Sequence, residues 1–271
     1  MTSENLDLGT DHVLCDITGP IATVTLNRPE KRNAFGPEML TGLTRALDLT
    51  SMNDTVRVVV LTGSGTVFCA GGDMAGMGGN GADAPMDEKV RALTEMQEAA
   101  TLTLFHHPKP VIAVLPGVAA GAGMSLALAC DLRIAVEGAG FVPAFGAIAA
   151  SGDFGGSWLL PKLIGPARAK EIYFTGRRVD TAEAAALGLF NRVVSTEALN
   201  ATVQATATHI AAQAPIALRN MKANHNLAMA TDLKTTMEQE AKNMMQCLHT
   251  QDHIDAVQAF FAKEKPVFHG R

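Results

Sequence analysis

The hydrophobic pattern of the chain predicts two buried strands that each lead into a glycine-rich turn. Residues 111–115 (VIAVL) form a short charge-free run, which is typical of a strand buried on both faces. The segment GAG follows at 121–123. Residues 56–62 form a second strong strand, and the loop GSGTVFCAGGDM follows it at 63–74. Small residues in both turns let a ligand approach the backbone closely.

A short helix is predicted directly after the first of these turns, over residues 124–130. The first N–H groups of a helix have no intrahelical partner, and the peptide dipoles add to their positive character. Such an end attracts an anionic oxygen. If the two glycine turns are neighbours, one backbone N–H from each could bind a single oxygen, which is the geometry of an oxyanion hole.

The pattern in the first half of the chain also predicts two strands followed by a helix, a ββα-like order. Alternating apolar positions predict an antiparallel hairpin of residues 13–17 and 22–26 around a Gly-Pro turn. Leucines at helical spacing over 40–47 predict a helix, and 86–105 predicts another that ends before two histidines.

Two segments are expected to be loose. Residues 1–11 lack the basic and apolar regions of a signal peptide, and we expect a loose tail there. Residues 76–85 contain four glycines among ten residues, which indicates a mobile loop over the site.

The second half is mostly helical by pattern. Residues 166–174 predict a helix, and Asp180 is placed to cap another. A short strand is expected over 191–194, and three or four helices over 197–262. We therefore divide the chain into a core with the active site, residues 1–200, and a C-terminal helical region for oligomerisation, residues 201–271.

Composition narrows the possible functions. The 271 residues are 47% hydrophobic, which is enough for a sizeable core, and the net charge of −5 argues against a nucleic-acid binder. Four scattered cysteines without a CxxC pair suggest neither a zinc site nor a disulfide framework, and favour a reducing compartment such as the cytoplasm. Residues 111–130 are long and charge-free, but proline and glycines interrupt them, so we expect no membrane span. Adjacent His106 and His107 would diverge on an extended segment, so we expect no metal site.

Several motifs together resemble those of the crotonase (enoyl-CoA hydratase/isomerase) superfamily. They are FCAGGDM at 68–74, PVIA at 110–113 with GAG at 121–123, and CDLRIA at 130–135. LNRP at 26–29, the segment 155–165 and the tail 260–271 extend the resemblance over nearly the whole chain. It implies an α/β fold, a crotonase-like spiral of ββα units with a C-terminal helical region. It also implies an enzyme of acyl-CoA thioesters, as in fatty acid metabolism, that forms homotrimers or dimers of trimers.

The resemblance also assigns site residues position by position. Gly72 and Ala122 would donate the two oxyanion N–H groups. Arg28, in a loop whose basic residues would otherwise be solvated charges, would line the channel for the coenzyme A adenine and phosphates. Further contacts to the substrate and its coenzyme A are implied for Ala34, Ala70, Gly72, Asp73, Met74, Ala122, Ser125 and Phe145. No metal and no cofactor is implied, since coenzyme A enters as part of the thioester.

The sequence departs from the pattern of the water-adding members. Those members resemble one another in two glutamates, and the matching positions here are Ser125 and Phe145. Neither is an acid or base near neutral pH. Asp153 is the one acid in 138–161. Its segment resembles that of single-aspartate isomerases, including the 1,2-epoxyphenylacetyl-CoA isomerase type, in which the aspartate is the acid/base; otherwise it would simply cap a helix.

We therefore predict an acyl-CoA isomerase that works through a thioester enolate. The alternatives are an enoyl-CoA hydratase that uses Asp153 with Asp73 or a bound water, and a hydrolase or dehalogenase with Asp153 as nucleophile. Two further classes stay open. One is a dinucleotide-dependent oxidoreductase, although Leu126 stands where its fingerprint needs a third glycine. The other is a non-catalytic acyl-CoA binder.

Overall fold

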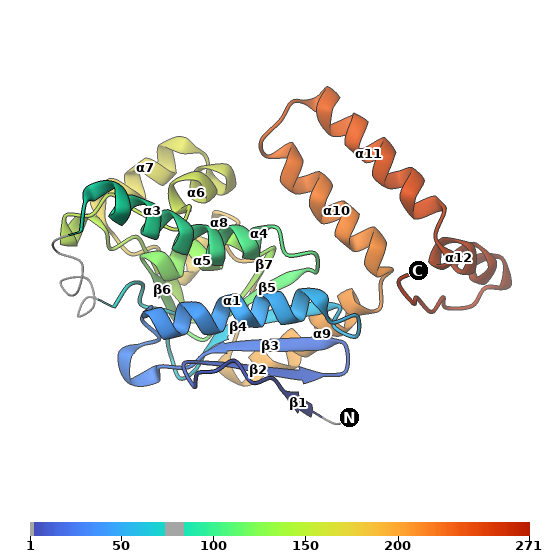
Figure 1. Ribbon diagram of the computed structural model, residues 1–271, viewed down its shortest axis with the longest axis horizontal. Helices are drawn as coiled ribbons and strands as arrows, with labels where there is room; N and C mark the ends of the chain where they lie inside the picture. The colour runs from blue at the N-terminus through green and yellow to red at the C-terminus, as the bar shows by residue number, and fades with distance from the viewer. Residues whose placement is uncertain (1–2, 74–83) are drawn as a thin grey trace.

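A computed structural model describes residues 3–73 and 84–271, and its centre is a seven-stranded sheet (Figure 1). The strand order is β1-β2-β3-β4-β5-β7-β9. The first two pairings are antiparallel, and every pairing from β3 onward is parallel. The strands are β1 (Ser3–Asn5), β2 (Val13–Thr18), β3 (Ile21–Leu26), β4 (Val58–Gly63), β5 (Val111–Leu115), β7 (Leu132–Val136) and β9 (Arg192–Val194). The predicted α/β class is therefore confirmed.

The predicted hairpin is confirmed, but the expected loose tail is wrong. Strand β2 pairs with β3 through a two-residue turn, since Thr18 lies opposite Ile21. The N-terminal residues from Ser3 onward add strand β1 to the free edge of β2. The buried side chain of Leu8 continues this contact. The edge of β2 offers unpaired backbone groups, which is why a short polar segment becomes a strand here.

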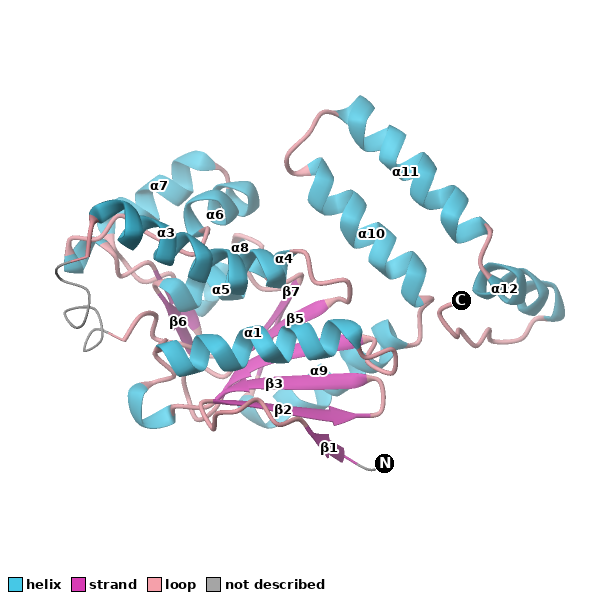
Figure 2. Ribbon diagram, viewed as in Figure 1, coloured by secondary structure: helices cyan, strands magenta, loops and turns pink. Residues whose placement is uncertain are grey.

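Helices cover the sheet, with α1 in front of the strands and α9 behind them in the view of Figure 2. Helix α1 (Pro37–Met52) packs on β2 and β3, while α9 (Thr196–Ala211) packs on β3, β4 and β7. Helix α9 buries its apolar residues in the main core, although it crosses the predicted division at residue 200. The division itself stays a prediction.

The predicted helix over 86–105 is present, with one local departure. It consists of α3 (Met86–Gln97), a π-helical turn (Glu98–Leu102) and α4 (Thr103–Phe105) in direct succession. A π turn carries an extra residue and commonly occurs at functional sites. Most of the glycine loop predicted over 76–85 lies outside the described residues.

The residues that lead into the site form a second, smaller sheet and a helix. Strand β6 (Val118–Ala120) pairs in parallel with β8 (Gly140–Val142), and helix α5 (Ala122–Ala129) follows β6 with every residue buried. The charge-free run 111–130 is thus a buried strand, a second strand and a helix. In the described part of the chain, no helix is long and apolar enough to cross a membrane.

The remaining helices are short ones and a C-terminal group. The short ones are η1 (Pro29–Lys31), η3 (Gly146–Ile148), α6 (Gly156–Ile164), α7 (Pro166–Thr175) and α8 (Thr181–Ala186), and Asp180 caps α8 as predicted. Helices α10 (Pro215–Ala228), α11 (Leu233–Leu248) and α12 (Gln251–Ala262) complete the predicted C-terminal helices. Figure 1 shows the α10–α11 pair standing away from the sheet.

Candidate active site

The two glycine turns lie side by side. The Phe68 N–H donates to the Val118 carbonyl at 3.1 Å, and the Ala120 N–H donates to the Cys69 carbonyl at 2.8 Å. At Gly71 the two turns are so close that an added Cβ would lie 2.9 Å from the Ala120 oxygen. Its φ of +92° is also one that glycine alone adopts readily. The condition set by the sequence, that the two turns be neighbours, is met.

Both predicted oxyanion donors have an N–H that the backbone leaves free. Phe35 donates to the Gly71 carbonyl at 2.7 Å and accepts from Asp73 at 2.8 Å, so the intervening Gly72 N–H points away from Phe35. Ala122 is the first residue of α5, where an N–H has no intrahelical acceptor. Neither N–H has a backbone acceptor within residues 3–73 and 84–271.

Helix α5, which begins at Ala122, also holds the main chain of Asp153. The Ser125 hydroxyl, one turn into α5, donates to the Asp153 main-chain oxygen at 3.0 Å. The Asp153 side chain is half-buried, and its Oδ1 has no hydrogen-bond partner in the described chain. Burial raises the pKa of this carboxyl above its ordinary value. The environment therefore favours a carboxyl group that can hold a proton.

The structure contradicts the capping alternative for Asp153. Helix α6 begins at Gly156, its N-cap residue is Gly155, and no side chain caps it. Gly155 adopts φ +76°, and the Gly156 N–H at the helix start donates to the Asp153 main-chain oxygen at 3.3 Å. The structure thus leaves Asp153 without a capping role.

Phe145 and Ser125, at the positions matched to the hydratase glutamates, are both buried. The Phe145 ring is 7% exposed and lies against the Gly121 turn, with its Cε1 3.8 Å from the position of an added Cβ. Ser125 is fully buried, and its hydroxyl is already engaged with the Asp153 carbonyl. Asp153 is the one carboxylic acid of residues 138–161, the segment that also carries Phe145.

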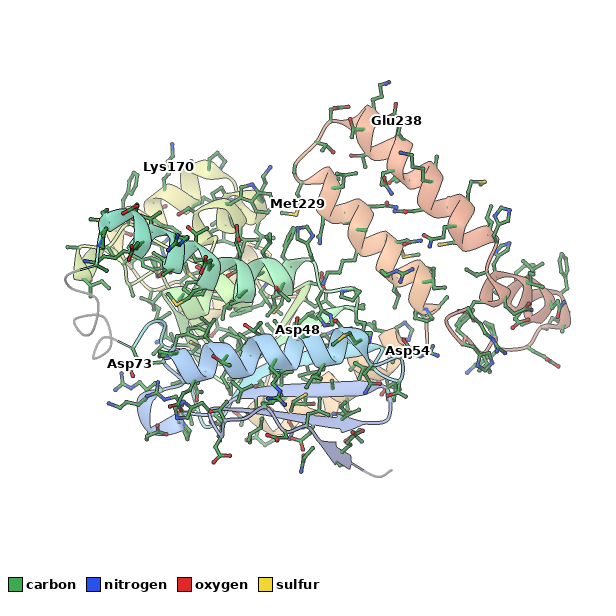
Figure 3. The ribbon with its side chains drawn as sticks, viewed as in Figure 1. Asp48, Asp54, Asp73, Lys170, Met229 and Glu238 are labelled. Carbon is green, nitrogen blue, oxygen red and sulfur yellow. The ribbon has the colours of Figure 1, made fainter. Side chains whose placement is uncertain are left out.

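Arg28, Ala34 and Asp73 also come together, beside the glycine turn of residues 71–73. The Arg28 guanidinium donates to the Ala34 carbonyl at 2.9 Å and to Asp73 Oδ2 at 3.1 Å. Its side chain is 13% exposed, so the alternative of a solvated surface charge is wrong for this arginine. Figure 3 shows Asp73 beside the N-terminal end of α1, opposite the end that carries Asp54.

Asn33 fixes the same loop onto the turn. Its side-chain amide donates to the Ser64 carbonyl at 2.9 Å and to the Val67 carbonyl at 2.8 Å. The Ala70 N–H in turn donates to the Arg32 carbonyl at 3.0 Å. Met74, the last of the predicted contact residues, lies outside the described residues.

Two features near Asp153 were not predicted. The first is a cavity of about 680 Å³ next to the following residue, Phe154, with a largely apolar lining that includes Leu102, Phe105, Phe154, Trp158, Leu159 and Leu227. The second is Tyr173 on α7, whose ring stacks on Phe145 with centroids 5.9 Å apart. Tyr173 is the single tyrosine of the chain, and no local motif marks it.

Comparison with known proteins identifies the family. The family model described as enoyl-CoA hydratase/isomerase matches residues 16–271. Among similar proteins, the 1,2-epoxyphenylacetyl-CoA isomerase of Escherichia coli is 35% identical over 261 residues, which cover 96% of this chain and 99% of that protein. The crotonyl-CoA hydratase of Syntrophomonas wolfei is 33% identical, with 95% of this chain and 98% of that protein covered.

A solved structure supports the same family assignment. The enoyl-CoA hydratase of Bacillus anthracis superposes with a TM-score of 0.89 at 34% identity, over 96% of this chain and all of that one. The chain belongs to the enoyl-CoA hydratase/isomerase family and is an enzyme of the crotonase superfamily. This assignment replaces the oxidoreductase and non-catalytic alternatives considered from the sequence.

Proposed function

We propose that this protein is an acyl-CoA isomerase that shifts a double bond, or rearranges an unsaturated or cyclic acyl group, through a thioester enolate. Removal of an α-proton places negative charge on the thioester oxygen. Two fixed N–H donors stabilise that charge where it develops. In this proposal the donors are Gly72 and Ala122, on the two turns that touch, and Asp153 moves the proton.

The observation that carries the proposal is the state of the Asp153 carboxyl. It does not cap α6, its Oδ1 has no partner in the described chain, and burial raises its pKa. A carboxyl with a raised pKa can take a proton from one carbon and return it to another. Because Ser125 and Phe145 supply no second carboxylate, one group has to do both, which favours isomerisation.

The runner-up is hydration of an enoyl-CoA, with Asp153 as the group that activates water. The relative from Syntrophomonas wolfei bears the name of a crotonyl-CoA hydratase, whereas the relative from Escherichia coli bears that of an isomerase. Asp73 supports neither reaction as a base, because its carboxylate pairs with Arg28. Attack by Asp153 as a nucleophile, in a hydrolase or dehalogenase, has no further observation in its favour.

We propose the predicted contact residues for the thioester and its coenzyme A, with Arg28 fixing the loop that would receive the nucleotide. No redox cofactor is needed, because a proton transfer within the substrate leaves its oxidation state unchanged. The four cysteines are free thiols, three of them buried, which supports a reducing compartment such as the cytoplasm.

A mass-spectrometric turnover screen over 2-enoyl, 3-enoyl and aryl-acetyl CoA thioesters tests the proposal. Isomerisation leaves the mass unchanged and alters the retention time, whereas hydration adds the mass of one water. Exchange of the α-proton in deuterated solvent, followed by NMR, monitors enolate formation directly. Absence of exchange with every thioester of the panel would contradict the proposed function.

A further inference from the structure

Two buried oxygens near the site have no hydrogen-bond partner in the described chain. They are Oδ1 of Asp153 and Oη of Tyr173. Buried polar atoms in folded proteins are almost always hydrogen-bonded, because an unpaired one costs stability. Two unpaired oxygens on and against one backbone turn therefore point to a group that binds between them.

Both oxygens lie on or against the backbone turn 152–156. An added Cβ at Gly152 would lie 3.3 Å from Cε1 of Tyr173, and one at Gly156 would collide with Tyr173 Oη. The tyrosine ring thus runs along the turn to which Asp153 belongs. Gly152 and Gly156 provide the space that the ring and its hydroxyl occupy.

The Tyr173 phenol stacks on a neighbouring ring and is neutral at neutral pH. Its ring stacks on Phe145 with an interplanar angle of 12°. Burial raises the pKa of Tyr173 to about 12, and the nearby charge of Asp153 adds to this rise. The hydroxyls of Ser157 and Ser125 lie beside Tyr173 Oη and lower its pKa, but neither forms a hydrogen bond of acceptable geometry with it. Tyr173 is therefore available as a neutral donor, while an ionised Asp153 is an acceptor.

We propose that Tyr173 and Asp153 form a subsite for one hydroxyl group. The hydroxyl accepts a hydrogen bond from Tyr173 Oη and donates one to Asp153 Oδ1, and both roles suit a single O–H group. A thioester carbonyl or an alkyl group cannot fill both roles. The hydroxyl belongs either to the acyl chain or to a water molecule. The subsite rests on the proposed function, because that function places Asp153 beside the acyl group.

Tyr173→Phe isolates the hydroxyl from the ring. The variant keeps the stacking on Phe145 and removes one oxygen that makes no hydrogen bond in the described chain. We expect its Tm to equal or exceed that of the wild type, because an unsatisfied buried group is removed. Thr175→Val is the matched control, since it removes a hydroxyl from the exposed end of the same helix, where it bonds to Glu171.

Two measurements separate the two sources of the hydroxyl. If the acyl chain carries it, the wild type binds 3-hydroxybutanoyl-CoA about 10-fold or more tightly than butanoyl-CoA, and Tyr173→Phe loses that preference. If water supplies it, the wild type adds water to 2-butenoyl-CoA, and Tyr173→Phe slows this addition by about 10-fold or more. The control variant keeps both properties.

The subsite is overturned if Tyr173→Phe retains both properties within about twofold, or if the wild type shows neither. A lower Tm with unchanged selectivity also overturns it, because the hydroxyl would then be structural. Exchange of the butanoyl-CoA α-proton in deuterated solvent distinguishes this failure from that of the proposed function. Wild-type exchange without any hydroxyl preference or hydration rejects the subsite and leaves the enolate chemistry standing.

Discussion

Ser125 and Asp153 are joined by a hydrogen bond of 3.0 Å, from the serine hydroxyl to the aspartate main-chain oxygen. This bond fastens the turn that carries the acid to helix α5, whose first residue is Ala122. The acid and one proposed oxyanion donor are thereby held on one buried element. Such a fixed relationship suits proton transfer, which depends on geometry before it depends on pKa.

Asp153→Asn should reduce turnover without destabilising the fold. The Asp153 side chain does not cap α6, so we expect the free energy of unfolding at neutral pH to stay equal or to rise. Turnover should fall by about 10²–10⁴, the usual range for a general acid–base residue. Asp48→Asn, an exposed acid on α1, is the control and should change neither quantity. Rates of α-proton exchange and thermal unfolding curves test this prediction. Unchanged exchange in Asp153→Asn would mean that Asp153 does not transfer the proton.

The stability difference between this variant and the wild type should depend on pH in one direction. Burial places the folded-state pKa of Asp153 above that of an unfolded aspartate, about 3.9. The folded state favours the protonated acid. The stability that Asp153 contributes to the wild type is therefore present below the unfolded pKa and is lost as the pH rises through the raised pKa. Asparagine does not titrate. Urea unfolding between pH 4 and 8 should show that Asp153→Asn gains stability relative to the wild type as the pH rises. If the variant instead loses stability relative to the wild type, the folded state stabilises the carboxylate, and the raised pKa is contradicted.

Ala122→Pro should remove a proposed oxyanion donor while preserving the helix. Proline is tolerated at the first position of a helix, which is where Ala122 stands, and it has no N–H. Loss of one such donor in other enzymes costs about 10²–10³ in turnover. Ala122→Ser keeps the N–H and serves as the control. Full turnover by a folded Ala122→Pro protein would exclude this N–H from the reaction.

The sequence could predict those parts of the site that follow from local backbone chemistry. The two turns were predicted because glycine-rich loops follow buried strands, and Asp153 stood out as the one acid of an apolar segment. The choice of Gly72 and Ala122 within those turns came from the resemblance to the crotonase superfamily. Tyr173 could not be predicted in this way, since nothing along α7 indicates which of its residues faces Phe145 and Gly156 across the fold.

Two backbone features escaped prediction for a similar reason. Strand β1 depends on the free edge of β2, because three polar residues carry no strand pattern of their own. The π turn Glu98–Leu102 lies inside a segment that the apolar pattern predicts to be one continuous helix. Gln97 and Thr101, at this turn, bond to the backbone of Phe154 at 3.1 and 3.2 Å, so the turn helps to place the residue after Asp153.

Assembly in multiples of three is the last prediction, and it remains a proposal. The C-terminal helices leave many large apolar side chains exposed, namely Met221, Leu233, Met237, Met244, Met245, Ile254, Val257, Phe260 and Phe261. Exposed apolar patches of this kind mark association surfaces in soluble proteins.

Phe260 and Phe261 offer the sharpest test, since they are 77% and 79% exposed and lie edge to face at the end of α12. Burial of an aromatic ring contributes about 1.5–3 kcal/mol, so replacing both with serine should shift a trimer or hexamer towards smaller species. Met52→Ser, an exposed change at the end of α1, is the control. Light scattering at micromolar concentration measures the mass. A wild-type monomer would contradict the proposed assembly, and an unchanged oligomer in the double variant would move the interface away from α12.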